Sequence, residues 1–192
     1  MRLKIVLTTI LLISGTPLFS QVAPARERGL PIAIGVGFSD FDTDWSGRER
    51  GTTVWVDWNF YSAPSLLKGL GLEVEGRDLS YGRSGSDPNL RLDTVGGGPI
   101  YTWRRFQKVH PYGKFLINYG SIDFTSSDPD YKHDTRTVYT PGVGVKYKAF
   151  RNIWLRGDYE YQFWTDFFHH NALNPEGFTI GASFDFRHIH SR

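Results

Sequence analysis

Imidazole and carboxylate side chains gather in one polar stretch near the end of the chain. Asp166 is followed by His169, His170 and Asn171. Groups of these types can ligate a metal ion or act as a general base. Hydrolysis through such a base would also need a nucleophile, but residues 165–177 contain no serine and the chain contains no cysteine. We therefore interpret the stretch as a polar surface loop, keep these four residues as secondary candidates, and predict no catalytic residue, metal site or cofactor.

Charged residues elsewhere recur at every second position, as where Arg156 is followed by Asp158 and Glu160. Residues two apart share one face of a β-strand, so Asp158 and Glu160 could act as a catalytic acid pair, but Arg156 beside them favours ion pairing. Seven acids and six bases follow this pattern and nearly balance, as buried charges must: Asp57, Glu73, Glu75, Asp93, Asp158, Glu160 and Asp185 with Arg77, Arg91, Lys114, Lys146, Arg156 and Arg187. We predict that they form a structural charge network in the interior of the fold, and only secondarily a channel lining.

The elements that would position these residues are β-strands. Apolar and polar side chains alternate through most of the chain and no stretch holds a helical period, which indicates an all-β fold. Two segments break phase, around Gly96–Pro99 and near Ile122, and we predict bulges or tight bends there. Eight strands can be placed, at residues 32–41, 52–61, 70–79, 91–103, 111–123, 136–147, 153–164 and 178–187.

The connections between these segments alternate in length. Long polar connections at residues 42–51, 80–90, 124–135 and 165–177 alternate with the short ones SAPSLLKG, RRFQKVH and KAFRN. An up-and-down antiparallel meander with its long loops at one end and its short turns at the other gives this alternation, whereas a Greek-key sandwich would mix the lengths. The sequence therefore predicts an eight-stranded antiparallel up-and-down barrel.

Two kinds of barrel fit this pattern, a soluble calyx with an apolar interior and a membrane barrel with a polar one. Aromatic residues make up 16% of the chain, and bulky aromatics on one face of nearly every strand suit lipid better than water. Tyrosine and tryptophan also gather near the proposed strand ends, where interfacial girdles form: Tyr61, Tyr101, Trp103, Tyr112 and Tyr147. These observations favour the transmembrane barrel, and the calyx with an apolar ligand stays an alternative.

The N-terminus carries an export signal. In residues 1–20, Arg2 and Lys4 precede a mostly apolar run from Ile5 to Ile13, which is too short for the ~20 residues of a spanning helix. We predict a cleavable signal peptide at 1–20, a linker at 21–30, the barrel at 31–187 and a tail at 188–192. The net charge of +2 offers no electrostatic footprint for nucleic acid.

The chain is similar to the superfamily of small eight-stranded outer-membrane β-barrels that includes the OmpA barrel domain, OmpX and the opacity proteins. The resemblance is carried by FTIGASFDF (178–186), RGDYEYQFW (156–164), GGGPIYTW (96–103) and the loop pattern, and it covers the mature chain. It implies a monomer in a Gram-negative outer membrane, in contact with lipid and lipopolysaccharide and inserted by the barrel assembly machinery. The alternating last strand closes on Phe186, but residues 187–192 follow it, unlike the usual terminus of such barrels.

The resemblance implies a fold more firmly than a molecular function. The leading hypothesis is a non-enzymatic barrel that supports the envelope or presents its loops for recognition and adhesion. A narrow porin-like channel for ions or small solutes is one alternative. A lipid-modifying enzyme is another, because outer-membrane lipid A deacylases carry a His-x-Ser-Asn stretch where this chain has His169, His170 and Asn171 without the serine.

Overall fold

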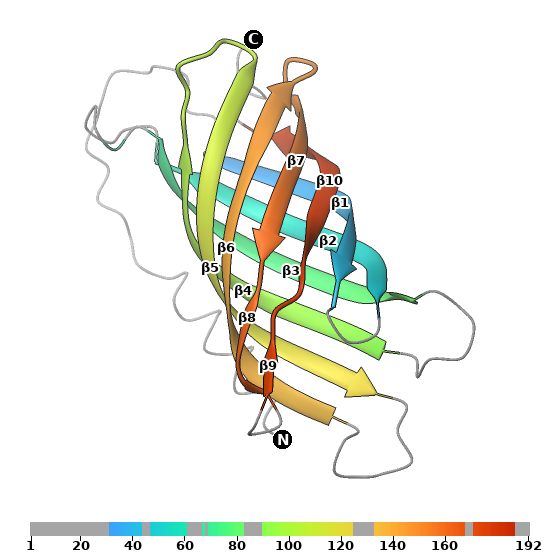
Figure 1. Cartoon of the computed structure of the whole chain (residues 1–192). Coiled ribbons are helices and arrows are strands. Elements are labelled where there is room, and N and C mark those ends of the chain that lie inside the picture. Colours follow the sequence, from blue (N-terminus) through green and yellow to red (C-terminus); the bar gives the residue numbers. More distant parts are fainter. Residues whose placement is uncertain are drawn as a thin grey trace, which may run out of the picture.

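The computed structural model describes residues 31–43, 47–60, 67, 69–82, 90–124, 133–167 and 171–186, and these ranges are almost entirely β-strand (Figure 1). None of the helical residues in these ranges belongs to a helix long and apolar enough to cross a membrane. The strands are β1 Ile32–Asp42, β2 Arg48–Asn59, β3 Leu70–Gly82, β4 Leu90–Thr102, β5 Val109–Phe124, β6 His133–Lys148, β7 Ile153–Tyr161, β8 Phe163–Phe167, β9 Asn171–Leu173 and β10 Glu176–Asp185.

The strands close into a barrel. Each strand from β1 to β6 pairs antiparallel with the next, β1 pairs with β10, and β10 pairs with β7. Strands β7 and β8 both pair with β6 and are separated only by Gln162, so together they form one interrupted strand of the barrel. The backbone N–H of Gln162 donates to Pro175 O at 2.8 Å, which ties this break to the one between β9 and β10. The predicted eight-stranded antiparallel barrel is confirmed.

Of the bulges or tight bends predicted at Gly96–Pro99 and near Ile122, the bulges are wrong. Strand β4 keeps one register against β3 from Leu70↔Tyr101 to Leu79↔Leu92, and β5 keeps one register against β6 past Ile122. The register shift lies instead between Arg50 and Gly51 where β2 pairs with β3, and a second one lies between β8 and β9. Even-numbered residues of β4 and β5 face inward from 92 to 102 and from 110 to 122, including apolar Leu92 and Ile122. Because these two inward residues are apolar, the alternation of apolar and polar residues looks as though it changes phase at them.

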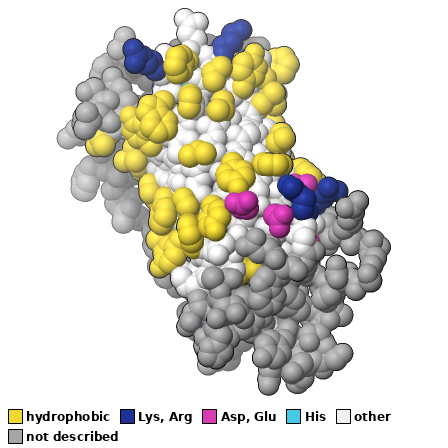
Figure 2. All heavy atoms as spheres, in the orientation of Figure 1, with side chains coloured by type: hydrophobic (Ala, Val, Ile, Leu, Met, Phe, Trp, Pro, Cys, Tyr) yellow, Lys and Arg dark blue, Asp and Glu magenta, His cyan; other side chains and the backbone are white. Residues whose placement is uncertain are grey.

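The interior changes character along the barrel axis. Near the long connections it is filled by an apolar plug of seven buried side chains: Phe41, Leu79, Leu92, Ile122, Val138, Trp164 and Leu173. Toward the short turns the inward side chains are mainly polar and charged. The outer surface changes in the opposite sense, from charged beside the plug to apolar beyond it (Figure 2). A sheet that is apolar inside and polar outside suits water, and the reverse suits lipid.

The apolar part of the outer surface is a continuous belt. Val36, Val74, Val143 and Ile180 are 55%, 57%, 65% and 69% exposed on four different strands. On β5 the belt runs from Val109 to Tyr119, and at a rise of about 3.4 Å per residue and a tilt of roughly 40° this spans about 25 Å. That height matches the lipid-facing band of outer-membrane barrels.

Candidate functional site

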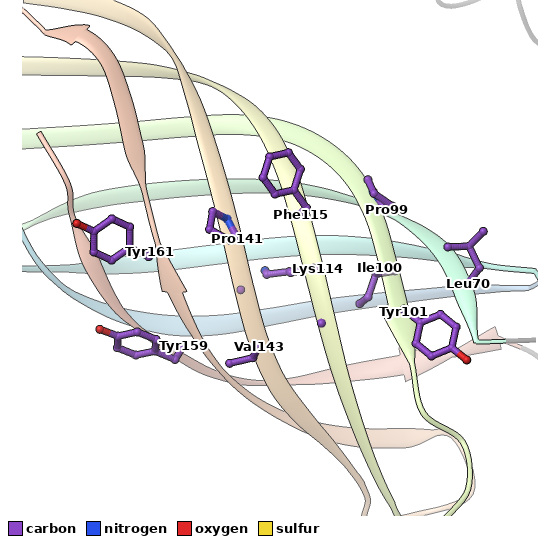
Figure 3. Close-up of a pocket in the computed structure, with 12 residues that line it drawn as sticks. Leu70, Pro99, Ile100, Tyr101, Lys114, Phe115, Pro141, Val143, Tyr159 and Tyr161 are labelled. Carbon is purple, nitrogen blue, oxygen red and sulfur yellow. The ribbon is translucent and has the colours of Figure 1, made fainter. Parts of the chain in front are cut away.

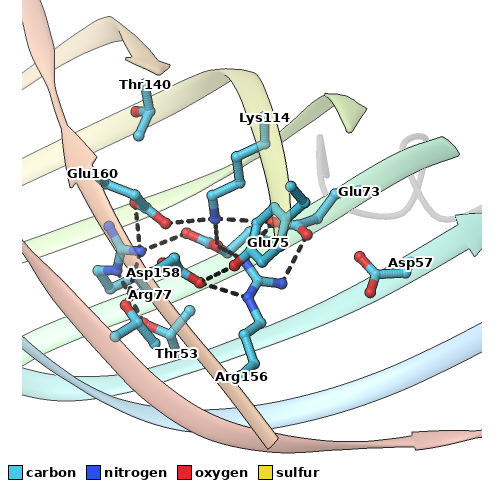
Figure 4. Close-up of polar contacts among 12 residues, drawn as sticks. Thr53, Asp57, Glu73, Glu75, Arg77, Lys114, Thr140, Arg156, Asp158 and Glu160 are labelled. Carbon is cyan, nitrogen blue, oxygen red and sulfur yellow. Dashed lines mark hydrogen bonds and ion pairs between the residues drawn. The ribbon is translucent and has the colours of Figure 1, made fainter. Parts of the chain in front are cut away.

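Seven charged side chains meet in the centre of the barrel and form the luminal charge cluster: Glu73, Glu75, Arg77, Lys114, Arg156, Asp158 and Glu160 (Figure 4). They come from β3, β5 and β7, and every one is at most 5% exposed. The two-residue spacing places each group on the inward face of its strand, and barrel closure brings the three strands opposite one another. All seven are among the residues that the sequence assigns to an interior network.

Arg156 links the cluster across the lumen. Its Nη1 and Nη2 atoms donate to Glu73 at 2.7 and 2.9 Å, and its Nε donates to Asp158 at 2.5 Å. The planar guanidinium is suited to this two-pronged contact with a carboxylate. Its other faces lie over the Trp55 ring at 4.4 Å and the Tyr112 ring at 5.1 Å. Carboxylates and aromatic rings together therefore fix the position of the Arg156 guanidinium.

Two more cations complete the cluster. Arg77 donates through Nη2 to Glu75 and Glu160, each at 2.7 Å, and through Nε to Thr53 at 2.9 Å. Lys114 contacts Glu73 at 2.9 Å and Glu75 at 2.6 Å, and it also pairs with Glu160. Each carboxylate of the cluster therefore meets at least one cation, as burial of so many charges requires.

A separate ion pair lies toward the short turns, where Lys146 donates to Asp57 at 2.6 Å. Beyond it is a small polar cavity of about 50 Å³, bordered by Asp57, Lys146 and the buried Asp185. The backbone N–H of Asp185 donates to Asn152 O at 2.8 Å, and the Asn152 amide donates back to Asp185 O at 3.0 Å. Buried side chains of the apolar plug, the luminal charge cluster and this ion pair thus succeed one another along the lumen.

The predicted interior network leaves out two aromatic residues. Tyr112, predicted to lie in an interfacial girdle, is 2% exposed and donates to Asp158 at 2.5 Å. Trp55, 1% exposed, lies against Arg156. The signal that could have placed Tyr112 is its spacing, two residues before inward Lys114. Of the other girdle residues, Tyr101, Trp103 and Tyr147 are exposed, and Tyr61 lies outside the described residues.

Trp55 fits only because glycine faces it. A Cβ added at Gly35 would lie 2.2 Å from Trp55 Cε2, whereas one added at outward-facing Gly157 would meet nothing within 4 Å. We expect Gly35→Val to destabilise the barrel by about 1–3 kcal/mol through overpacking, and Gly157→Val to leave stability nearly unchanged. Denaturant unfolding in lipid vesicles would measure both. Equal losses for the two variants would contradict this packing.

Arg91 and Asp93 do not join the interior network. They are odd-numbered residues of β4 and face outward beside the plug, where Arg91 pairs with Asp78 at 2.8 Å and with Asp93 at 3.0 Å. The expected phase break in β4 caused this error, because it assigned inward positions to the wrong residues. Arg187, the last member of the predicted network, lies outside the described residues.

The outward charges beside the plug form an ion-pair band: Asp40, Arg48, Arg50, Asp78, Arg91, Asp93, Asp123 and His133. This band lies beyond the apolar belt. Partial burial acts to raise the pKa of Asp40, but hydrogen bonds from Arg48 and Arg50 outweigh it and hold this pKa below its usual value. Burial and the facing Asp78 carboxylate raise the pKa of Asp93. These two carboxylates are partly shielded from water, whereas the side chains of Arg48, Arg50 and Arg91 are exposed.

Of the four loop candidates, two lie in described strands and two do not. Asp166 belongs to β8 and Asn171 to β9, where Asn171 pairs with Phe167, and His169 and His170 lie outside the described residues. Among the residues that the structure describes, no group of three or more histidines and carboxylates is placed to hold a metal ion.

A groove of about 570 Å³ lies on the outer surface over β4, β5, β6 and β7 (Figure 3). Phe115 lies between Pro99 and Pro141 in this groove. A proline has no backbone N–H to donate. Accordingly, Pro99 is not paired with β5 and Pro141 is not paired with β7. The groove falls within the apolar belt, so membrane lipid covers it.

Comparison with known proteins agrees with this architecture. The family model of the outer membrane protein beta-barrel domain matches residues 9–186. Neisserial surface protein A (NspA) is similar in structure, with a TM-score of 0.60 and 16% identity over 83% of this chain and 100% of that chain. No curated protein matches the sequence.

Two further solved structures share the fold. Ail, the attachment invasion locus protein of Yersinia pestis, has a TM-score of 0.55 and 19% identity over 80% of this chain and 96% of that chain. OprG from Pseudomonas aeruginosa has a TM-score of 0.55 and 12% identity over 80% of this chain and 94% of that chain. Identities this low establish the fold alone, whereas the family match spans most of the sequence. This chain therefore belongs to the family of outer membrane protein beta-barrel domains and resides in the outer membrane.

Proposed function

We propose that this protein is a non-enzymatic, non-conducting anchor that acts through its outer surface and long loops, in recognition, adhesion or envelope support. The observation that carries the proposal is the filled lumen. The apolar plug closes the interior at the long-loop end, and the luminal charge cluster closes it at the centre. An eight-stranded barrel has room for little besides its own side chains.

The charge cluster supports a structural role over a conducting one. A pathway for ions would have to separate Arg156 from Glu73 and Lys114 from Glu75, contacts that are buried and 2.6–2.9 Å long. Removing one partner from a buried pair costs several kcal/mol, about 3–5 in typical cases. A side chain that moved aside would pay a similar penalty, so spontaneous opening is disfavoured.

A planar bilayer experiment tests closure. Protein that shows the heat-dependent gel mobility of a folded barrel is inserted at 1 M KCl, and we expect no stepwise conductance. A general porin inserted in the same bilayer shows that channels would be detected. Discrete, reproducible steps from the wild-type protein would overturn the non-conducting proposal and favour the narrow channel.

The ligand seen with one relative does not transfer easily to this chain. Ail of Yersinia pestis was solved with the heparin analogue sucrose octasulfate. In the four long connections of this chain acids outnumber bases, which opposes binding of a sulfated polyanion. The acids are Asp42, Asp44, Glu49, Asp87, Asp128, Asp130, Asp134, Asp166 and Glu176, and the bases are Arg48, Arg50, Arg83 and Lys132.

A loop experiment tests the surface role. Residues 83–89 and 125–132 are each replaced by a short Asn-Gly turn, and cells displaying the variant or the wild type are compared for attachment to epithelial monolayers and to heparin-coated wells. We expect the variant to keep its heat-dependent mobility and lose attachment to cells, with no heparin binding by either. Equal attachment of both proteins would contradict recognition by these loops.

A further inference from the structure

Two of the short turns of the barrel are strongly basic. The turn between β4 and β5 and the turn between β6 and β7, with their flanking residues, contain five basic residues and no acidic residue. These residues form the basic rim: Arg104, Arg105, Lys108, Lys148 and Arg151. Arg105, Lys108 and Arg151 are exposed, and Arg104 and Lys148 are half-buried. In outer-membrane barrels the short turns face the periplasm, so the rim lies at the inner leaflet.

A backbone hydrogen bond joins the two turns, and a side-chain hydrogen bond fixes the first turn on its other side. The N–H of Lys148 donates to Lys108 O at 2.8 Å, which joins the end of β6 to the start of β5. On the other side of the first turn, Arg104 donates to the Asn59 side chain at 2.7 Å. The rim is therefore one patch across neighbouring strands of the barrel, and these strands fix the positions of its basic residues.

Large apolar side chains stand among these charges. Trp103, Phe106 and Phe150 are 51%, 57% and 70% exposed. The lipid-facing residues Val109 and Tyr147 each adjoin a lysine of the rim in sequence. One residue of a strand rises about 3.4 Å, so the cations lie within a few ångströms of the apolar belt. This is the depth of the phosphate groups in the leaflet.

We propose that the basic rim binds the headgroups of anionic phospholipids in the inner leaflet, with Phe106 and Phe150 inserted among the acyl chains. Ammonium and guanidinium groups supply the charge that phosphate needs, and the exposed rings supply the apolar contact. Continuity with the apolar belt favours lipid over the acidic cell wall, because a wall polymer would not cover exposed phenylalanine. On the face that Figure 2 shows, basic side chains and no acidic side chain are visible at this end, whereas acids and bases mix beyond the belt.

Native mass spectrometry of the full-length mature protein can test the proposal. The detergent-solubilised barrel is titrated with phosphatidylglycerol and with phosphatidylcholine of the same acyl chains. Each cation near an anionic surface strengthens association about fivefold, so we expect phosphatidylglycerol to be retained at least about fivefold more strongly. Raising the ionic strength should reduce the preference.

Matched variants separate the two ends of the molecule. The triple change Arg105→Gln, Lys108→Gln and Lys148→Gln should remove most of the preference, because it leaves two of the five rim cations. The control change Arg48→Gln, Arg50→Gln and Arg91→Gln removes three cations from the ion-pair band and should leave the preference intact. Single Lys108→Gln, expected to weaken it severalfold, serves if the triple variant does not fold.

Three results would overturn the proposal: equal retention of the two lipids by the wild type, an unchanged preference in the basic-rim variants, or loss of the preference in the control. Sedimentation with purified peptidoglycan sacculi, dependent on the same cations and without any lipid preference, would reassign the rim to the cell wall. The lipid preference does not depend on closure of the lumen, so conductance in the bilayer experiment would overturn the proposed function without affecting this inference.

Discussion

Replacing Arg156 by methionine is expected to destabilise the folded barrel by about 3–5 kcal/mol, the usual loss when one partner of a buried ion pair is removed. Methionine keeps much of the length of the side chain but donates no hydrogen bond. Glu73 then loses both guanidinium hydrogen bonds and keeps its ion pair with Lys114, and Asp158 loses its ion pair and keeps the hydrogen bond from the Tyr112 hydroxyl. Unfolding by urea in phospholipid vesicles, followed by tryptophan fluorescence and gel mobility, measures the change.

An exposed pair of the same chemistry serves as the control. Arg91 contacts two aspartates on the outer surface, and its side chain is 54% exposed. We expect Arg91→Met to cost less than about 1 kcal/mol, because water screens the charge and solvates the aspartates left behind. The double variant Arg156→Met, Glu73→Gln should lose less than the two single losses combined, since each removes the other's partner. Equal costs at Arg156 and Arg91 would refute a tightly coupled cluster.

The sequence predicts the strands and most of the interior because the side-chain period of a strand is two. Asp158 and Glu160 follow Arg156 at that spacing, and the structure brings all three inward. Pairing between distant strands follows from closure of the barrel. The contacts of Arg156 with Glu73 and Trp55 depend on shear and rotamers, which a periodic pattern does not encode.

The main error came from treating the lumen as uniformly polar. Leu92 and Ile122 face inward because the barrel continues beyond the membrane, where the interior must be apolar and the exterior polar. A rule that assigns the polar face to the interior therefore fails above the belt. It exchanged the faces of Arg91 and Asp93, and it introduced two bulges where the register is continuous.

This reversal sets the level of the membrane and leads to a second large effect. Val143 on β6 is 65% exposed in the middle of the apolar belt, and Thr137 faces outward six residues closer to the long loops. We expect Val143→Arg to cost about 2–4 kcal/mol, the penalty for an arginine near the midplane, and Thr137→Arg to cost about 0–1 kcal/mol, as near an interface. Urea unfolding in vesicles of one lipid composition compares them on the same strand.

The paired residues on β5 make the comparison sharper. Thr137 lies opposite Tyr119, which marks the end of the belt, whereas Val143 lies opposite Gly113. An arginine at 137 can extend into the headgroups beside Tyr119, but one at 143 has lipid on both sides. A large penalty at both positions would move the membrane boundary outward over the ion-pair band, and Asp40, Arg91 and Asp93 would then face hydrocarbon. Their exposed charges could not be accommodated there, so the boundary at Tyr119 is the placement under which the outer surface and the inner plug are both satisfied.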